Sequence, residues 1–450
     1  MHIKNMYHRI ISGDARSVTV KKNIAASLIV KGLSIVVSLL LVPLTLGYVS
    51  SELYGIWLTL SSIMLWLNFF DVGFTLGLKN KLAEAIALEQ WDRGKALVST
   101  TYFMMIAIFV PLCLILEIVI PAVNWSAFLN VDQIYNSDIQ RAMYILTACF
   151  CLQMIVNVLI AVVAAFQQVA LSSAFPVIGQ ILSFIVIFIL TKCCPPSLYA
   201  LSMSISVMPI IVVLIASIIL YSTRFNRVAP SIRAFDRNNV KDLFNLGVKF
   251  FIIQIQVVVM FQTTNILISN LSGPNDVTSY NIAYKYISIG LMVFNIILAP
   301  LWPAFTDAYT RKDYAWMNSI YKKMKKIWGL TTAAIICMVV CSPIVYNLWI
   351  GEKAEIPFLM TVIVGVYIIL HSWDSLQVTL INGIGHVKLQ SYVTIIGPIS
   401  HIPMSIFIGK YIGAYGVIVS MIIITIVYLS FFTIQVRNIL NRRATGIWIE

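Results

Sequence analysis

The chain contains a succession of largely apolar runs, each long enough to cross a lipid bilayer. They cover residues 24–46, 54–78, 97–121, 141–164, 171–191, 197–221, 246–270, 279–303, 327–350, 357–381, 389–409 and 414–436. Lipid offers no hydrogen-bond partners, so a spanning segment must satisfy its own backbone groups. The runs are about twice the length of a barrel strand and do not alternate. They therefore predict an all-α integral membrane protein with about 12 transmembrane helices.

Composition excludes a water-soluble fold of this length. Hydrophobic residues make up 60% of the 450 residues and charged residues 11%, whereas a soluble domain has about a quarter charged residues. The cysteines lie in or beside apolar runs without metal-ligand spacing, so neither disulfides nor a metal site is expected. The first apolar run is too long for a cleavable signal and is expected to be the first span.

Lysine and arginine are distributed unevenly between the connections. If the N-terminus is cytoplasmic, nearly all of these cations face the cytoplasm, and the exceptions are Arg141, Lys192, Lys353 and Lys410. The positive-inside rule therefore places both termini in the cytoplasm. The net charge of +13 then reflects topology, and no nucleic acid partner is expected. The lysine-rich stretch 322–326 predicts an interfacial helix.

The two halves of the chain look like a repeat. Tyr54 follows the first span in the sequence SSELYGIW, and Tyr280 follows the seventh in VTSYNIAY. Glu84 and Asp307 match at nearly the same offset. Six spans in each half would give both halves the same orientation, related by an axis along the membrane normal. We therefore expect an N-terminal six-helix bundle over 1–222, a C-terminal one over 223–450, and alternating access.

Three motifs are similar to those of one transporter family. They are DVGFTLGLKNKLAEAIA at Asp71–Ala87, LWPAFTDAYTRKDY at Leu301–Tyr314 and NGIGHVKLQ at Asn382–Gln390. Together they resemble the bacterial polysaccharide biosynthesis or O-antigen flippase family of the multidrug/oligosaccharidyl-lipid/polysaccharide (MOP) exporter superfamily. The likeness extends over essentially the whole chain. It implies a MATE-like fold, in which two six-helix bundles face each other across a central cavity.

The resemblance also implies a function. Members of this family are flippases that move undecaprenyl-pyrophosphate-linked oligosaccharide units, of O-antigen or capsule type, to the periplasmic leaflet of the bacterial inner membrane. The partners expected from it are this lipid-linked glycan, the bilayer and other polysaccharide assembly proteins. Neither catalytic residues nor a cofactor is expected, and coupling to H⁺ or Na⁺ stays open.

Two lysines, Lys31 and Lys285, lie inside apolar runs. An ionised lysine near the bilayer centre costs roughly 2.5–3.5 kcal/mol, so each needs water, an acid or an anionic ligand. Both could reach the nearer membrane surface with their long side chains. The resemblance implies instead a cationic cavity that matches a pyrophosphate, which makes both lysines candidate substrate-binding residues.

Three amides in the seventh span, Gln254, Gln256 and Asn265, are further candidates for the cavity. Amides donate and accept hydrogen bonds together and would suit sugar hydroxyls. The same side chains would also suit contact with a neighbouring helix. Both interpretations remain open.

Intramembrane ionisable groups mark candidate sites for ion coupling or gating. His371 and Asp374 are three residues apart and share a face of the tenth span. They predict either a proton-coupling pair or a structural pair. Asp71 lies near the cytoplasmic boundary before a small-residue pair, Gly73 and Gly77. It is either part of a gate or a solvated charge beside a helix-packing site.

Other functions remain as alternatives. A multidrug cation antiporter of the same fold needs acids at cavity depth, whereas this chain places lysines in its first and eighth spans. A membrane-embedded polysaccharide biosynthesis enzyme usually carries a large loop with acid and base groups, and the longest extracytoplasmic connection here is about Ala122–Gln140. A non-transporting scaffold would not need buried cations. We therefore expect a transporter rather than an enzyme.

Overall fold

The computed structural model describes residues 15–66, 74–166, 168–237, 239–240, 261–298, 301, 305, 308–309 and 311–448. Over these residues the regular structure is helical and contains no strand. Ten helices among them are long and apolar enough to cross a membrane. Each overlaps a predicted span, and the other two predicted spans, 54–78 and 246–270, extend beyond the described ranges. The predicted all-α membrane fold is confirmed.

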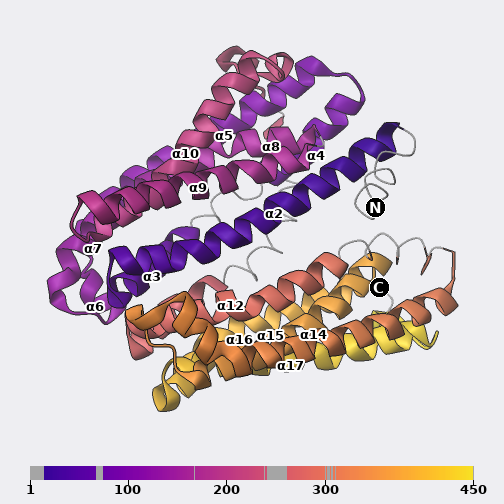
Figure 1. The fold of residues 1–450 in the computed structure, drawn as a ribbon. Helices are drawn as coiled ribbons and strands as arrows, with labels where there is room; N and C mark the ends of the chain where they lie inside the picture. Colours follow the sequence, from indigo (N-terminus) through magenta and orange to yellow (C-terminus); the bar gives the residue numbers. More distant parts are fainter. Residues whose placement is uncertain are drawn as a thin grey trace, which may run out of the picture. The chain divides into compact units, whose positions relative to one another are not determined.

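The first compact unit comprises residues 1–49, 63–128 and 132–255. It contains α2 (Ala15–Tyr48), α4 (Phe74–Ala87), α5 (Trp91–Val119), most of α6 (Trp125–Leu129), α7 (Asn136–Val156), α8 (Val158–Ala165), α9 (Val169–Cys193) and α10 (Leu198–Ser222). Helix α9 packs against α2 and α10, and α7 packs against α5 and α10 (Figure 1). After α10 the chain forms two short 3-10 turns, η4 (Asn226–Val228) and η5 (Ile232–Ala234), which lie against α5.

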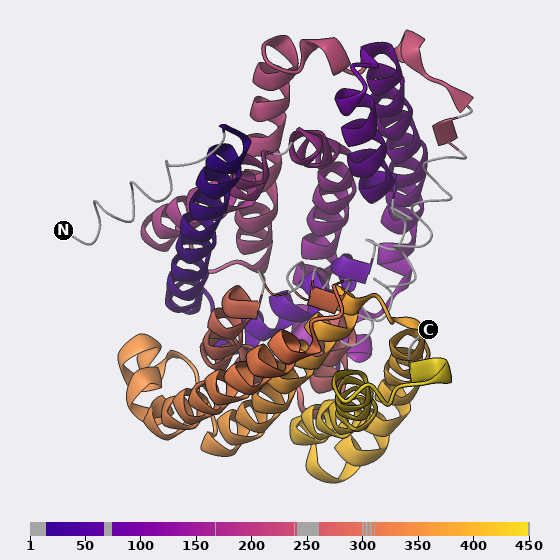
Figure 2. The same cartoon turned by 90° about the vertical axis from the view of Figure 1, so that its right-hand side faces the viewer.

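The second compact unit comprises residues 50–62, 129–131 and 256–450. It contains most of α3 (Ser51–Leu65), a helical segment at 261–272, α12 (Pro274–Leu298), α14 (Tyr314–Trp349), α15 (Phe358–Ile384), α16 (Lys388–Ile412) and α17 (Ala414–Leu440). Helix α17 packs against α15 and α16, and α15 packs against α12 and α14 (Figures 1 and 2). Two short segments from the first half of the sequence, 50–62 and 129–131, thus belong to this unit. The division at residues 222 and 223 stays a prediction.

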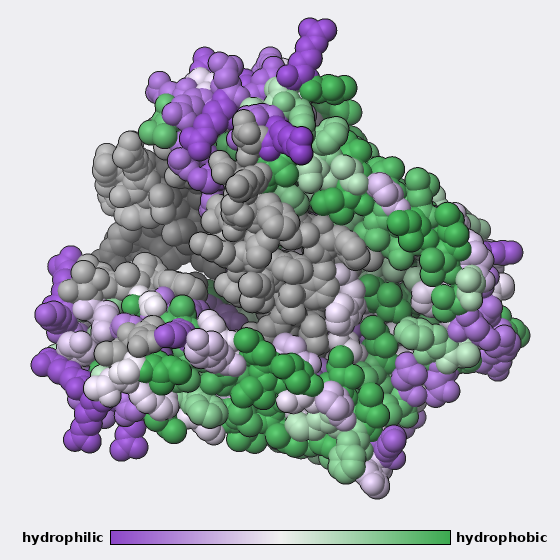
Figure 3. All heavy atoms as spheres, turned by 180° about the vertical axis from the view of Figure 1, so that it is seen from behind, coloured by the Kyte–Doolittle hydropathy of each residue, from purple (hydrophilic) through white to green (hydrophobic). Residues whose placement is uncertain are grey.

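The surface of these helices is apolar, as a lipid environment requires. Ile118 is 75% exposed, Ile218 69% and Leu348 82%. Figure 3 shows hydrophobic side chains over much of the visible surface, with hydrophilic ones gathered at its margins. Apolar surface on this scale is not stable in water, so lipid is the solvent that these helices fit.

Helix α14 is longer than the sequence predicts. Asp313 caps its first turn, where its carboxylate accepts a hydrogen bond of 2.9 Å from a backbone N–H. The interfacial helix expected around 322–326 is instead part of one continuous helix of 36 residues. The Lys325 amine lies 4.7 Å from the centre of the Tyr321 ring and 5.8 Å from that of Trp373. These cation–π contacts hold the lysine beside the bundle.

Candidate functional site

Lys285 lies at the centre of α12. The helix begins at Pro274, before the apolar run that starts at 279, so the lysine is about three turns, or about 16 Å, from its first residue. Counted from residue 279, where the predicted span begins, the lysine would be less than two turns from the start of the helix. The Lys285 Nζ donates a hydrogen bond of 3.5 Å to the Tyr54 hydroxyl on α3. No carboxylate among the described residues lies within ion-pairing distance of it.

Helices α3 and α12 approach each other closely at the first turns of α12. A Cβ atom on Gly55 would lie 1.8 Å from the backbone carbonyl oxygen of Pro274, so only glycine allows the approach. The Thr278 hydroxyl donates a hydrogen bond of 2.7 Å to the Ser51 carbonyl. These contacts hold the tyrosine hydroxyl in place beside the lysine amine.

Asn265 lies in a buried hydrogen-bond network. Its Nδ2 donates to the Ser62 Oγ at 2.7 Å, and its Oδ1 accepts from the Asn281 Nδ2 at 2.9 Å. Both polar atoms of the carboxamide therefore bind protein partners, which leaves one N–H and one lone pair for a ligand. A sugar-binding role for Asn265 stays a prediction.

Lys31 is exposed on α2, close to Ile29, where the candidate membrane span of that helix begins. A lysine at this depth can extend its amine to the headgroup region. Its exposure therefore fits the interpretation in which the side chain reaches the nearer membrane surface. Its role in binding stays a prediction. Three other predicted site residues, Asp71, Gln254 and Gln256, lie outside the described residues.

His371 and Asp374 face each other on α15. The distance from Nδ1 to Oδ2 is 4.0 Å, which is too long for a direct hydrogen bond. The Tyr367 ring stacks on the imidazole at 5.6 Å, and the Phe261 ring meets it edge-on at 6.2 Å. Asp374 is buried, and its Oδ1 has no hydrogen-bond partner within the described part of the chain. A buried carboxylate oxygen without a donor is a place where a proton or cation can bind.

Two of the three family-like motifs contact each other. Tyr309, from the motif at 301–314, forms a hydrogen bond of 2.7 Å between its hydroxyl and the Nε2 of His386, from the motif at 382–390. Gly385 ends α15 with a φ of 92°, which favours glycine. Partial burial lowers the pKa of His386, which favours the neutral form of the ring. Sequence reasoning missed this contact, although the glycine is a recognisable helix-end signal.

A third histidine, His401, has a structural role. It is fully buried on α16, and its Nδ1 lies 2.9 Å from the Ser420 Oγ on α17. The Nε2 lies 3.4 Å from the Thr264 hydroxyl. Both ring nitrogens thus have neutral partners within the second unit, as expected for a satisfied core histidine.

Comparison with known proteins identifies the fold and the family. A family model described as polysaccharide biosynthesis protein matches residues 20–309. An inward-facing MATE multidrug-resistance transporter of the MOP superfamily aligns with a TM-score of 0.77 over 92% of this chain and 96% of its own, at 14% identity. The lipid II flippase MurJ, in an inward closed conformation, aligns with a TM-score of 0.67 over 91% and 87%, at 15% identity. No curated protein matches the chain in sequence.

At such low identity the solved structures show the fold, and the family model shows the family because it covers more than half of the chain. The predicted family resemblance is therefore confirmed. This multi-pass membrane protein belongs to the polysaccharide biosynthesis protein family and has the MATE-like fold of the MOP superfamily.

Proposed function

We propose that this protein is a flippase that carries an undecaprenyl-pyrophosphate-linked oligosaccharide from the cytoplasmic to the periplasmic leaflet of a bacterial inner membrane. The observation that carries the proposal is Lys285, a cation in the middle of a membrane helix with no described carboxylate in reach. Such a charge costs roughly 2.5–3.5 kcal/mol, which an anionic ligand can recover. Membership of the polysaccharide biosynthesis family supports a lipid-linked glycan as the source of the anion.

The chemistry of Lys285 suits a pyrophosphate. An ammonium binds phosphate oxygens as a point charge and does not demand the planar fit of a guanidinium. Its hydrogen bond to Tyr54 is long, at 3.5 Å, and the amine has further N–H donors for a ligand. Lys31, in the first unit, supplies a second cation in this proposal, which the ligand reaches at another point of the transport cycle.

We further propose that His371 and Asp374 couple transport to a proton or sodium ion. Asp374 offers a buried oxygen without a donor, and the imidazole of His371 lies 4.0 Å away on the same helix face. A proton bound between them would replace this separation with a hydrogen bond. A pH gradient and a sodium gradient, applied in turn to the same vesicles, distinguish the two ions.

Reconstitution tests the flippase directly. Proteoliposomes carry undecaprenyl-pyrophosphate-linked oligosaccharide in both leaflets, and a membrane-impermeant glycosidase digests only what reaches the outer one. With protein present, digestion should proceed from the outer-leaflet share to nearly all of the glycan. Vesicles without protein, and vesicles that contain a neutral glycolipid, serve as controls.

The same vesicles test the alternative function. A multidrug cation antiporter would exchange ethidium for protons and would leave the inner-leaflet glycan protected. Asp374 is the buried acid that such an antiporter could use. Ethidium exchange together with protected glycan would overturn the flippase proposal.

A further inference from the structure

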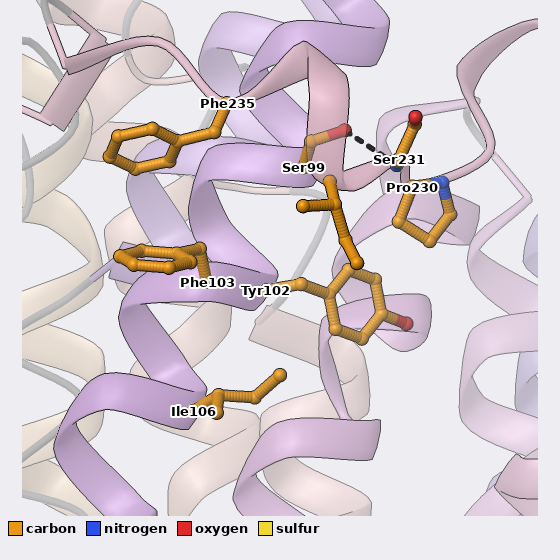
Figure 4. Close-up of a pocket in the computed structure, with 8 residues that line it drawn as sticks. Ser99, Tyr102, Phe103, Ile106, Pro230, Ser231 and Phe235 are labelled. Atoms are coloured by element: carbon orange, nitrogen blue, oxygen red, sulfur yellow. Dashed lines mark hydrogen bonds between the residues drawn. The ribbon is translucent and has the colours of Figure 1, made fainter.

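A pocket lies between α5 and the segment 223–237 that follows α10 (Figure 4). Its volume is about 270 Å³, and its walls are mainly apolar, with Phe103 and Ile106 on α5 opposite Ile232 and Phe235 on the segment. All of these residues belong to the first unit. The transport function proposed above makes no use of this pocket.

Two adjacent hydroxyls of α5 hold the segment in place. The backbone N–H of Ser231 donates to the Ser99 Oγ at 3.0 Å (Figure 4). The backbone N–H of Asp236 donates to the Thr100 Oγ1 at 3.1 Å, and the same hydroxyl donates back to the Asp236 carbonyl at 3.3 Å. The outer wall of the pocket is therefore fixed at both ends by hydrogen bonds to α5.

The pocket suits an apolar chain. Its Tyr102 hydroxyl lies 3.3 Å from the Tyr221 hydroxyl and is thereby already engaged. The Phe103 and Phe235 rings pack at 4.5 Å, yet Phe103 remains 52% exposed and Ile232 is 97% exposed. The volume lies below the roughly 300–1,000 Å³ of sites for compact ligands. A segment of one hydrocarbon chain fits these dimensions.

Arginines surround this apolar pocket. The segment 223–237 contains one acidic residue, Asp236, and four arginines, which are Arg224, Arg227, Arg233 and Arg237. Arg233 follows Ile232 directly, and Arg237 lies two residues after Phe235. Both arginines are exposed, and neither forms an ion pair within the described ranges. Positive charge is therefore available beside the pocket.

The pocket lies inward of the membrane interface, at the depth of the acyl chains. Arg227 lies 5.1 Å over the ring of Trp91, the first residue of α5, and tryptophan favours the membrane interface. The pocket residues of α5 are about 12–22 Å further along the helix. The predicted topology places this end of α5 on the cytoplasmic side.

We propose that the pocket binds one acyl chain of an anionic phospholipid of the cytoplasmic leaflet, and that Arg233 and Arg237 bind its phosphate. Guanidinium groups pair with phosphate through two hydrogen bonds, and anionic lipids attract arginines at the membrane surface. A zwitterionic phospholipid has the same acyl chain but no net negative charge. The proposed site should therefore bind the anionic phospholipid in preference to the zwitterionic one.

Photocrosslinking in nanodiscs tests the site. The probe is phosphatidylglycerol with a diazirine in one acyl chain, compared with the matching phosphatidylcholine. Peptides that contain residues 99–106 or 230–235 should be labelled in excess by phosphatidylglycerol. Removal of either arginine should lower the labelling by phosphatidylglycerol about fivefold. The double variant Arg233→Gln with Arg237→Gln should therefore lose roughly 25-fold, and Arg443→Gln, an exposed arginine near the C-terminus, should lose none.

A second variant tests the pocket itself. Ile106 is 47% exposed, so Ile106→Trp can fill the pocket without disturbing the core, and it should abolish acyl-chain labelling at an unchanged melting temperature. If that protein is unstable, the double variant of Arg233 and Arg237 alone tests the proposal. Equal labelling by both lipids, or pocket peptides that stay unlabelled, would overturn the proposal, as would labelling that survives the double substitution.

Discussion

Replacement of Asn265 by alanine should destabilise the second unit. Its carboxamide connects three helices, because it binds Ser62 on α3 and Asn281 on α12 from the segment 261–272. Interhelical hydrogen bonds in membranes contribute about 0.6 kcal/mol on average and up to about 1.7 kcal/mol. Loss of both bonds should therefore cost about 1–3 kcal/mol in free energy of unfolding. The side chain is only 9% exposed, so the cavity left behind adds to this cost.

A double-mutant cycle isolates one of these bonds. Unfolding by sodium dodecyl sulfate in mixed micelles gives the free energies of Asn265→Ala, Ser62→Ala and the double variant. The coupling energy between the two sites should lie between about 0.6 and about 1.7 kcal/mol. Asn275→Ala, on an exposed asparagine of α12, is the matched control and should change stability little.

Zero coupling, with Asn265→Ala as stable as the wild type, would refute the network. Normal stability together with lost transport would instead assign the amide to the substrate, as its predicted sugar-binding role requires. The same variants therefore separate a structural asparagine from a ligand-binding one.

Three further predictions concern packing, coupling and topology. Gly55→Ala should lower the free energy of unfolding by about 1–3 kcal/mol or more, because its Cβ would collide with the backbone of Pro274. Gly32→Ala is the control and should not destabilise the protein, because a Cβ there meets nothing within 4 Å. Thermal unfolding in detergent compares the two variants, and equal stability would contradict the close approach of α3 and α12. His371→Ala should flatten the pH dependence of flipping at normal abundance, and an unchanged pH profile would leave the pair a structural role. A cysteine at Lys353 should react with an impermeant thiol reagent from the periplasm and one at Arg443 should not, whereas the reverse pattern would contradict the predicted topology.

Membrane helices can be predicted from apolar run length because lipid imposes its demand on each segment separately. Their ends are harder to predict. Helix α12 begins at Pro274, ahead of its apolar run, because proline is tolerated in the first turn of a helix. Asp313 likewise extends α14 back through a polar, lysine-rich stretch. A hydropathy profile does not show where such helix ends lie, so the position of Lys285 within its helix could be found only from the structure.

The candidate site is predictable only where one helix builds it. His371 and Asp374 meet because residues three apart share a helix face. The contact of Lys285 with Tyr54 instead joins residues more than 200 positions apart, and no local pattern signals it. The pocket beneath the segment 223–237 is similar, because it depends on how a polar connection folds onto α5.

The most direct test of the central claim is transport by variants at Lys285. Cells that carry only Lys285→Gln or Lys285→Arg, at equal protein abundance, are compared for lipid-linked glycan accessible to an impermeant lectin at the periplasmic face. Loss of a hydrogen bond between charged groups costs about 1.5–3 kcal/mol, so Lys285→Gln should lower the initial flipping rate about tenfold or more. Lys285→Arg should retain more activity than Lys285→Gln, and Lys31→Gln should also be reduced. Normal export by both glutamine variants would contradict binding of an anionic headgroup by these lysines.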